Sequence, residues 1–289
     1  MYVEQHNPPP ILEIDRLTMR FKNVTVLRDI SITMRRGETL AVIGESGCGK
    51  TVLLKTLIGL LWPTSGSILF DGQPLADMSE AELSHQRTRY GFVFQQAALF
   101  DSMSIAENVA FPLRQHTDRS EEDIMGTVIR LLAEVGLPEL VLHKKPAELS
   151  GGMRKRVGFA RALAMEPELM LYDEPTTGLD PIMSDVINEL IVNTRNRRLQ
   201  TSDFGEEYGQ PTLKPTPVSG ILVTHDMKSA KKVADRIVML YPVARLRPDE
   251  SQIVYEGPAD EIDSSPDSRV TQFLHGEAGE RLMEMCRTR

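Results

Sequence analysis

The stretch "ETLAVIGESGCGKT", residues 38–51, decides the fold. It begins with a nearly continuous apolar run that ends on Gly44, as a strand buried on both faces would. The residues from Gly44 to Thr51 match the pattern G-x-x-x-x-G-K-T, in which glycines let backbone N–H groups close around phosphate oxygens. We expect a helix from Lys50 to about Leu60, whose N-terminus adds positive potential. The sequence therefore predicts a nucleotide-phosphate loop between a buried strand and a helix.

The side chains of this loop have separate expected roles. Lys50 reaches the terminal phosphates of the nucleotide, and Thr51 can ligate magnesium. Cys48 is interpreted as a small filler and not as a nucleophile, because the surrounding site is built for phosphate. The residues predicted to bind the nucleotide here are Gly44, Glu45, Ser46, Gly47, Cys48, Gly49, Lys50 and Thr51.

A second element of a phosphate site is the run "LMLYDEP", residues 169–175, in which two acids follow a buried strand. Ligands of parallel sheets collect at the carboxyl ends of the strands, so both acids should face the same crevice as Lys50. We expect Asp173 to hold magnesium and Glu174 to orient or deprotonate the attacking water.

Further candidates also end strand-like runs. His225 ends "ILVTHD" and can reach the same sheet edge, which favours a functional role over a structural one. Gln95 in "FVFQQ" could bind the metal or the water, although Gln96 could be mistaken for it. Phe21, on an early strand, could stack on adenine or pack in the core, and the sequence leaves both readings open.

The segment "LSGGMRKR", residues 149–156, opens a helix that is expected to run to Met165. Glycine in a helix costs about 1 kcal/mol relative to alanine, so its placement here needs a reason. The serine and glycines expose several backbone amides at a helix N-terminus, which is an anion site. The chain thus has two phosphate-binding helix N-termini, one at Lys50 and one at Ser150. A single nucleotide inside one chain would not obviously use both of them. Two chains arranged head to tail would.

The remaining pattern predicts an α/β fold. Residues 11–21 and 26–34 alternate apolar and polar residues as antiparallel strands do, and residues 104–165 read as mostly helical. Strand-like runs alternate with helical segments in the second half, which predicts a mainly parallel sheet covered on both faces. Asp180 is a good N-cap for a helix that begins at Pro181.

Composition limits the possible partners and compartments. The 289 residues are 41% hydrophobic and 26% charged, which is ordinary for a globular protein. A net charge of −8 provides no basic field for nucleic acid. The two cysteines, Cys48 and Cys286, cannot form a disulfide framework, so a reducing compartment is expected. No apolar run is long enough to span a membrane and the polar start lacks the core of a secretory signal, which predicts a cytosolic protein.

Taken together, these motifs resemble the nucleotide-binding subunit of ATP-binding cassette (ABC) transporters, from Ile11 to Pro258. In the order the family uses, Phe21 resembles the adenine-stacking aromatic, Gly44 to Thr51 the Walker A loop and Gln95 the Q-loop glutamine. Residues 149–152 then resemble the signature, Asp173 and Glu174 the Walker B pair, residues 178–180 the D-loop and His225 the switch histidine.

The resemblance implies a P-loop NTPase fold of the ABC type, in which a mixed or mainly parallel sheet carries an antiparallel β subdomain and a helical signature subdomain. It implies an ATPase that uses ATP and Mg²⁺, with Thr51, Gln95 and Asp173 at the metal. It also implies a homodimer that sandwiches ATP. Ser150, Gly151 and Gly152 would bind the γ-phosphate across the dimer, and Asp180 would also lie at the nucleotide site.

The expected domain organisation follows from the same comparison. Residues 1–10 form a disordered start, and residues 11–258 form the nucleotide-binding domain, with a helical subdomain at about 100–165 and a mobile insertion at about 195–219. Residues 259–289 form a C-terminal extension that is expected to be helical. It could brace a partner subunit or simply pack on its own chain or fray.

One residue that departs from the family pattern points to a particular subfamily. Most of the family continues the signature with glutamine, where this chain has Met153. Together with residues 98–114 and 176–191, this methionine is similar to the ATPases of Mla-type transporters, which work with MCE-domain proteins and move phospholipids between the membranes of Gram-negative bacteria. The resemblance implies a multi-span permease, sensed by the loop around residues 95–108, an MCE-domain partner and a place on the cytoplasmic side of the inner membrane. An ATPase of a small-solute importer and a soluble ABC ATPase acting on DNA or ribosomes are the alternatives.

Overall fold

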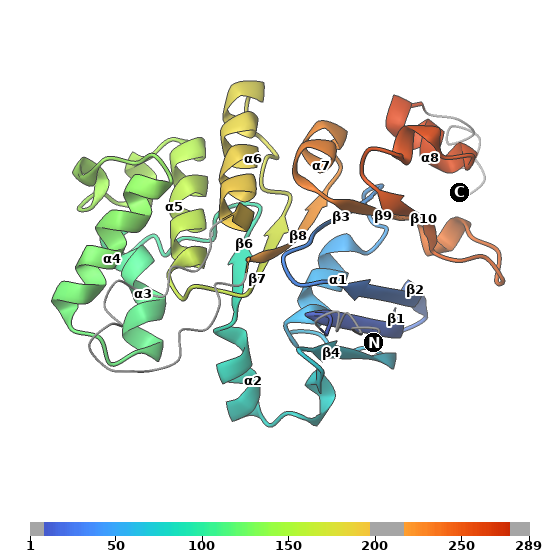
Figure 1. Cartoon of the computed structure of the whole chain (residues 1–289), viewed down its shortest axis with the longest axis horizontal. Coiled ribbons are helices and arrows are strands. Elements are labelled where there is room, and N and C mark those ends of the chain that lie inside the picture. The colour runs from blue at the N-terminus through green and yellow to red at the C-terminus, as the bar shows by residue number, and fades with distance from the viewer. Residues whose placement is uncertain (1–8, 197–216, 278–289) are drawn as a thin grey trace, which may run out of the picture.

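The computed structural model describes residues 9–196 and 217–277, which form two sheets and the helices around them (Figure 1). The larger sheet has the strand order β10-β9-β3-β8-β7-β6, and all its neighbouring strands run parallel except β10 against β9. Its strands are β3 (Thr39–Gly44), β6 (Tyr90–Val93), β7 (Leu169–Asp173), β8 (Ser219–Thr224), β9 (Arg236–Leu240) and β10 (Ile253–Pro258). This arrangement confirms the predicted α/β fold with a mainly parallel sheet.

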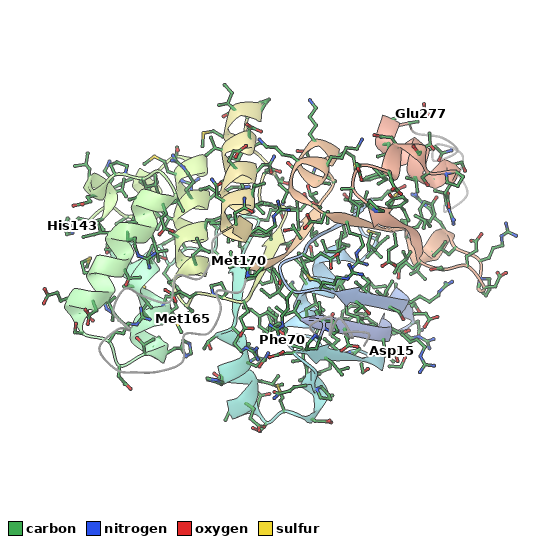
Figure 2. All side chains as sticks on the ribbon, viewed as in Figure 1. Asp15, Phe70, His143, Met165, Met170 and Glu277 are labelled. Carbon is green, nitrogen blue, oxygen red and sulfur yellow. The ribbon has the colours of Figure 1, made fainter. Side chains whose placement is uncertain are left out.

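Alternate residues of the central strands enter different cores. In β7, Leu169 and Leu171 pack with the antiparallel sheet, whereas Met170 and Tyr172 pack with the helices on the other face. The labels in Figure 2 mark Met170 and Phe70, which belong to these two cores. The period of two residues explains why these strands are apolar throughout, because both faces of the sheet are covered.

The smaller sheet is antiparallel, with the strand order β2-β1-β4-β5. It consists of β1 (Leu12–Phe21), β2 (Val24–Met34), β4 (Ser65–Phe70) and β5 (Gln73–Pro74). Helix α1 (Lys50–Leu57) packs in the same core as strands of both sheets, with Leu53 and Leu54 buried. It ends before the expected Leu60, because Gly59 adopts the left-handed conformation with φ +65°, which turns the chain.

Helices α3 (Ile105–His116), α4 (Glu121–Glu134) and α5 (Gly151–Leu163) pack together at one end of the molecule, as Figure 1 shows. The expected helical stretch of residues 104–165 is therefore confirmed, although α5 stops short of Met165. The apolar face of α4 is buried, with Ile124, Val128, Leu131 and Leu132 in the core. The other helices are α2 (Glu80–Arg87), α6 (Pro181–Asn196), α7 (Met227–Val233) and α8 (Ser268–His275).

Parts of the expected domain organisation lie outside the described residues. They are residues 1–8 of the expected start, residues 197–216 of the expected insertion and residues 278–289 of the expected C-terminal extension. Helix α8 lies within that extension. Among residues 9–196 and 217–277, none of the helices has the length and apolar character needed to cross a bilayer.

The packing of α1 between the sheets generates a stability prediction. Leu54 is fully buried, whereas Leu60 just beyond the helix has 56% of its surface exposed. Replacing Leu54 with Ala should lower the free energy of unfolding by about 2–5 kcal/mol, since it removes apolar contacts and leaves a cavity. Leu60→Ala is the matched control and should change it by about 0.5 kcal/mol at most. Urea denaturation followed by circular dichroism measures both, and equal losses would contradict the described packing.

Candidate active site

The loop between β3 and α1 has a backbone that only glycine adopts readily. Gly44, Gly47 and Gly49 have φ of +143°, +84° and +103°. A Cβ atom on Gly44 would lie 2.2 Å from the carbonyl oxygen of Leu240, and one on Gly49 would lie 2.6 Å from a methyl carbon of Leu27. Glycine is therefore required at Gly44 both by conformation and by space, because the blocking atom belongs to the backbone, and at Gly49 by conformation.

Lys50 begins α1 and folds back over the loop. Its ammonium group donates to the carbonyl oxygens of Gly44 at 2.7 Å and Glu45 at 3.0 Å, and the residue is buried. Cys48 is also buried, and burial raises the pKa of its thiol. A protonated thiol is a poor nucleophile, so the side chain of Cys48 fills space, as the sequence suggested. The loop thus places a cation next to a helix N-terminus, which suits a phosphate group.

Thr51 and Asp173 bring two oxygen atoms together at the end of β7. The Thr51 hydroxyl donates to Asp173 Oδ1 at 3.0 Å. Burial raises the pKa of the Asp173 carboxyl, against the lowering effects of the Thr51 hydrogen bond and of Lys55 and Lys50. Magnesium prefers oxygen ligands and commonly keeps few protein ligands beside phosphate and water. These two oxygens fit that pattern, and the described part of the chain contains no group of three or more His, Cys, Asp or Glu that could hold a metal by itself.

Glu174 is held in place from several directions. Its Oε2 atom lies 2.8 Å from Nδ1 of His225, and the Thr177 hydroxyl donates to the same oxygen at 3.1 Å. The Glu174 backbone N–H donates to the carbonyl oxygen of Val223 at 2.9 Å, and its φ is +48°, a value that is uncommon for residues other than glycine. Strained backbone of this kind clusters at functional sites, where surrounding contacts maintain it. The carboxylate is therefore oriented by contacts within the chain.

Lys155 is a residue of this site that the sequence analysis missed. It lies on α5, is buried, and its ammonium group donates to the carbonyl oxygens of Pro175 at 2.8 Å and Thr177 at 2.6 Å. Burial lowers the pKa of this lysine, and the Glu174 carboxylate opposes that effect. Lys155 thus ties the helix that follows the "LSGG" segment to the loop that follows Glu174.

The signal for Lys155 was the helical period. It lies three residues after Gly152 and four before Phe159, which are both buried, so all three share one face of α5. The sequence obscures this signal, because Lys155 stands between Arg154 and Arg156 and a run of three basic residues is typical of a solvated surface.

The signature residues lie apart from the phosphate loop of the same chain. Ser150 caps α5 by accepting a hydrogen bond from the N–H of Met153 at 3.3 Å. Helix α5 stands with α3 and α4, while α1 lies on the other side of β6 and β7 (Figure 1). A Cβ atom on Gly151 would meet nothing within 4 Å, whereas one on Gly152 would lie 3.0 Å from Met183 Cε. The described residues around Gly151 therefore do not account for its lack of a side chain.

The other predicted site residues are Gln95, Phe21 and Asp180, and each lies in a different environment. Gln95 lies in an exposed turn two residues beyond β6, and within the described ranges no hydrogen bond joins it to Thr51 or Asp173. Phe21 is 43% exposed at the end of β1, so core packing does not explain it. Asp180 caps α6, as predicted, and its carboxylate accepts from the N–H groups of the second and third residues of that helix, at 3.0 and 2.9 Å.

The chain is similar to known proteins both in sequence and in fold. The family model described as "ABC transporter" matches residues 27–177. The dimeric structure of a post-hydrolysis state of the ATP-binding cassette MJ0796 bound to ADP and Pi has a TM-score of 0.70 and 28% sequence identity, over 86% of this chain and 98% of that one.

Two curated relatives differ in the cargo that they are named for. The intermembrane phospholipid transport system ATP-binding protein MlaF of Haemophilus influenzae is 37% identical over 268 residues, 93% of this chain and 91% of the relative. The probable ribonucleotide transport ATP-binding protein mkl of Mycobacterium tuberculosis is 38% identical over 265 residues, 92% of this chain and 66% of the relative. This chain therefore spans slightly less than two thirds of the mycobacterial protein's length.

The buried position of Lys155 generates a second stability prediction. Lys155→Met keeps the length of the side chain but removes the ammonium donor from the buried carbonyl oxygen of Pro175 and the partly buried one of Thr177, which should lower the free energy of unfolding by about 1–3 kcal/mol. The matched control is Arg154→Met, because Arg154 is exposed and, among the described residues, its side chain donates to one carbonyl oxygen, that of Leu149. The control should lose less than about 1 kcal/mol. Thermal unfolding checks both, and a smaller loss for Lys155→Met than for the control would contradict the assigned contacts.

Proposed function

The chain belongs to the ABC transporter family, and we propose that it is the ATP-hydrolysing subunit of a membrane transporter for phospholipids. The observation that carries the proposal is the Glu174 carboxylate, which lies 2.8 Å from His225 and directly follows Asp173. Asp173 in turn accepts a hydrogen bond from Thr51, the last residue of the phosphate loop. Phosphoryl transfer to water requires an oriented acid, a cation at the phosphates and oxygen ligands for magnesium. All three lie at one edge of the sheet.

The phosphate loop binds the nucleotide through backbone N–H groups and Lys50. Residues 44–51 wrap the phosphates, and the lysine ammonium exchanges its two carbonyl acceptors for phosphate oxygens. Thr51 and Asp173, with Gln95 from the turn after the neighbouring strand β6, would hold Mg²⁺, which would neutralise charge on the phosphates. Phe21 stacks on the adenine, as its exposure at the end of β1 allows.

Hydrolysis uses Glu174 as the general base. A bond forms between the oxygen of water and the γ-phosphorus, and the bond from that phosphorus to the oxygen bridging to the β-phosphate breaks. Glu174 accepts the proton of the water, and ADP leaves with phosphate as the second product. His225 and Thr177 hold the Glu174 carboxylate in one orientation, so no reorganisation is needed at the moment of reaction.

The complete site requires two chains. Ser150, Gly151 and Gly152 begin a helix that lies apart from α1, so they bind the γ-phosphate of ATP held by the other copy. The space around Gly151 supports this arrangement, because a phosphate can approach its backbone from outside the chain. The dimeric structure of the similar cassette MJ0796 supports the same stoichiometry. Asp180, at the start of α6, lies in the segment that faces the partner.

The permease contacts the loop around residues 95–108. Phe94 and Phe100 are 38% and 42% exposed there, so the loop presents apolar surface. Arg161 of α5 donates to the carbonyl oxygen of Ala97 at 2.9 Å, which links this loop to the helix of the signature residues. Movement of the permease can therefore reach Ser150 through α5, and ATP binding can reach the permease by the reverse route.

Phospholipid is the proposed cargo for two reasons. The relative named for phospholipid transport is covered over 91% of its length, whereas the relative named for ribonucleotide transport is covered over 66%. Met153 after the signature also favours the Mla-type pattern. We infer a multi-span permease, an MCE-domain protein in the same complex and a location on the cytoplasmic side of the inner membrane. The ATPase of a small-solute importer is the second candidate, and a soluble ABC ATPase is the third.

Glu174→Gln tests the assignment of the base. The amide keeps the size of the carboxylate but cannot accept the proton, so ATP hydrolysis should fall by about 100-fold or more while ATP binding persists. The variant should accumulate as an ATP-bound dimer, which light scattering detects as a doubled mass. Glu189→Gln on the exposed face of α6 is the control and should hydrolyse ATP at the normal rate. Normal turnover by Glu174→Gln would remove Glu174 from this role.

Affinity purification from native membranes tests the partners and the cargo class. The tagged protein, extracted in mild detergent, should bring along a multi-span permease and an MCE-domain protein that an untagged control does not, as identified by mass spectrometry. A permease recovered with a solute-binding protein would instead assign small-solute import. A preparation without any membrane partner would favour the soluble ATPase.

A further inference from the structure

The connection between β9 and β10 is longer than two neighbouring antiparallel strands require. These strands are antiparallel neighbours, and residues 241–252 join them, twelve residues where most hairpins use about two to five. The connection lies against β2 at the edge of the molecule (Figure 1). Its last residue, Gln252, is only 1% exposed, so a polar amide is buried where the connection meets the phosphate loop.

The side-chain amide of Gln252 makes hydrogen bonds both to the phosphate loop and to β2. Its Nε2 atom donates to the carbonyl oxygen of Cys48 at 2.9 Å and to that of Val26 at 3.1 Å. Its Oε1 atom accepts from the backbone N–H of Arg28 at 2.8 Å. Gln252 therefore joins the phosphate loop to β2, and each of its polar atoms has a partner.

The bond to Cys48 fixes the direction of the neighbouring N–H group. The Cys48 carbonyl and the Gly49 N–H belong to the same planar trans peptide, so they point in opposite directions. Because Gln252 holds the carbonyl oxygen, the Gly49 N–H is directed away from Gln252 and the connection. No acceptor for the Gly49 N–H is found within the described residues, so this donor is available to a phosphate oxygen.

A second contact brings the same connection onto the loop. The guanidinium of Arg245 lies 2.7 Å from the carboxylate of Glu45, the second residue of the loop. The guanidinium of Arg28 anchors the connection to β2 by donating to the carbonyl oxygen of Arg247 at 2.7 Å. The connection thus meets the phosphate loop both at Glu45 and at Cys48.

We propose that Gln252 is a positioning residue for nucleotide binding, which holds the Cys48–Gly49 peptide so that the Gly49 N–H faces the phosphates of ATP. This inference rests on the proposed function, since it takes residues 44–51 as the ATP site. A role confined to packing would affect stability alone. A positioning role affects the affinity for nucleotide and leaves the chemical step unchanged, because within the described residues the side chain of Gln252 bonds to Cys48, Val26 and Arg28 and not to the residues that act on water.

The test compares Gln252→Met with Arg28→Met in the full chain. Methionine matches the length of glutamine but has no amide, so Kd and KM for Mg·ATP should rise about fivefold to tenfold, the effect of about one net hydrogen bond. The kcat at saturating ATP should stay within about twofold, which distinguishes loss of binding from loss of chemistry. Arg28→Met removes the guanidinium that binds the connection but keeps the backbone N–H that donates to Oε1 of Gln252. The Kd of this variant for Mg·ATP should therefore equal that of the wild type.

The outcomes separate this inference from the proposed function. If the wild-type chain does not bind Mg·ATP in calorimetry, the proposed function fails. If the wild type binds and Gln252→Met binds equally well, or if Arg28→Met weakens binding by the same factor, the role of Gln252 is rejected. Gln252→Glu, which keeps the acceptor but has no donor when ionised, should repeat the loss seen with methionine. Failure of both Gln252 variants to fold would make it a core residue and would also overturn the inference.

Discussion

The hydrogen bond between Thr51 and Asp173 is the contact on which the rest of the site depends, because it joins the helix after the phosphate loop to the end of β7. The residues directly after Asp173 are thereby held close to the loop. Glu174 turns sharply at that point and meets His225 from the end of the neighbouring strand, β8. A loop for phosphate and an acid for hydrolysis thus come from segments about 120 residues apart, because parallel strands end at one edge of the sheet.

Two buried polar side chains extend this arrangement outward. Lys155 holds the loop after Glu174 to α5, and Gln252 holds the phosphate loop to β2. Burying a polar group is costly unless its hydrogen bonds are made, so each of these contacts has a defined geometry. A rotation of α5 that carries Ser150 toward a partner must also carry or strain the segment next to Glu174. In our account, closure of the dimer and readiness of the base are therefore linked within one chain.

Much of the architecture could be predicted because it depends on local patterns. The apolar run before Gly44, the alternation in β1 and the capping at Asp180 each determine structure within a few residues. The contacts of Gln252 could not be predicted, because they join segments more than 200 residues apart and Gln252 belongs to no motif. Lys155 lies within the quoted "LSGGMRKR" segment, but its carbonyl partners on the loop after Glu174 are set by packing and not by a local pattern. The left-handed backbone of Glu174 was also missed, since it is imposed by the hydrogen bond to β8 and not by the residue's own preference.

The central claim is that each ATP site takes its phosphate loop from one chain and its signature helix from another. Mixing two inactive variants, Lys50→Ala and Ser150→Phe, tests it most directly by the rate of phosphate release. In the mixed dimer, one site receives both defects and the other receives neither, so the mixture should hydrolyse ATP although each variant alone does not. If the mixture is as inactive as its components while mixed dimers are shown to form, the two elements act within one chain and the account is wrong.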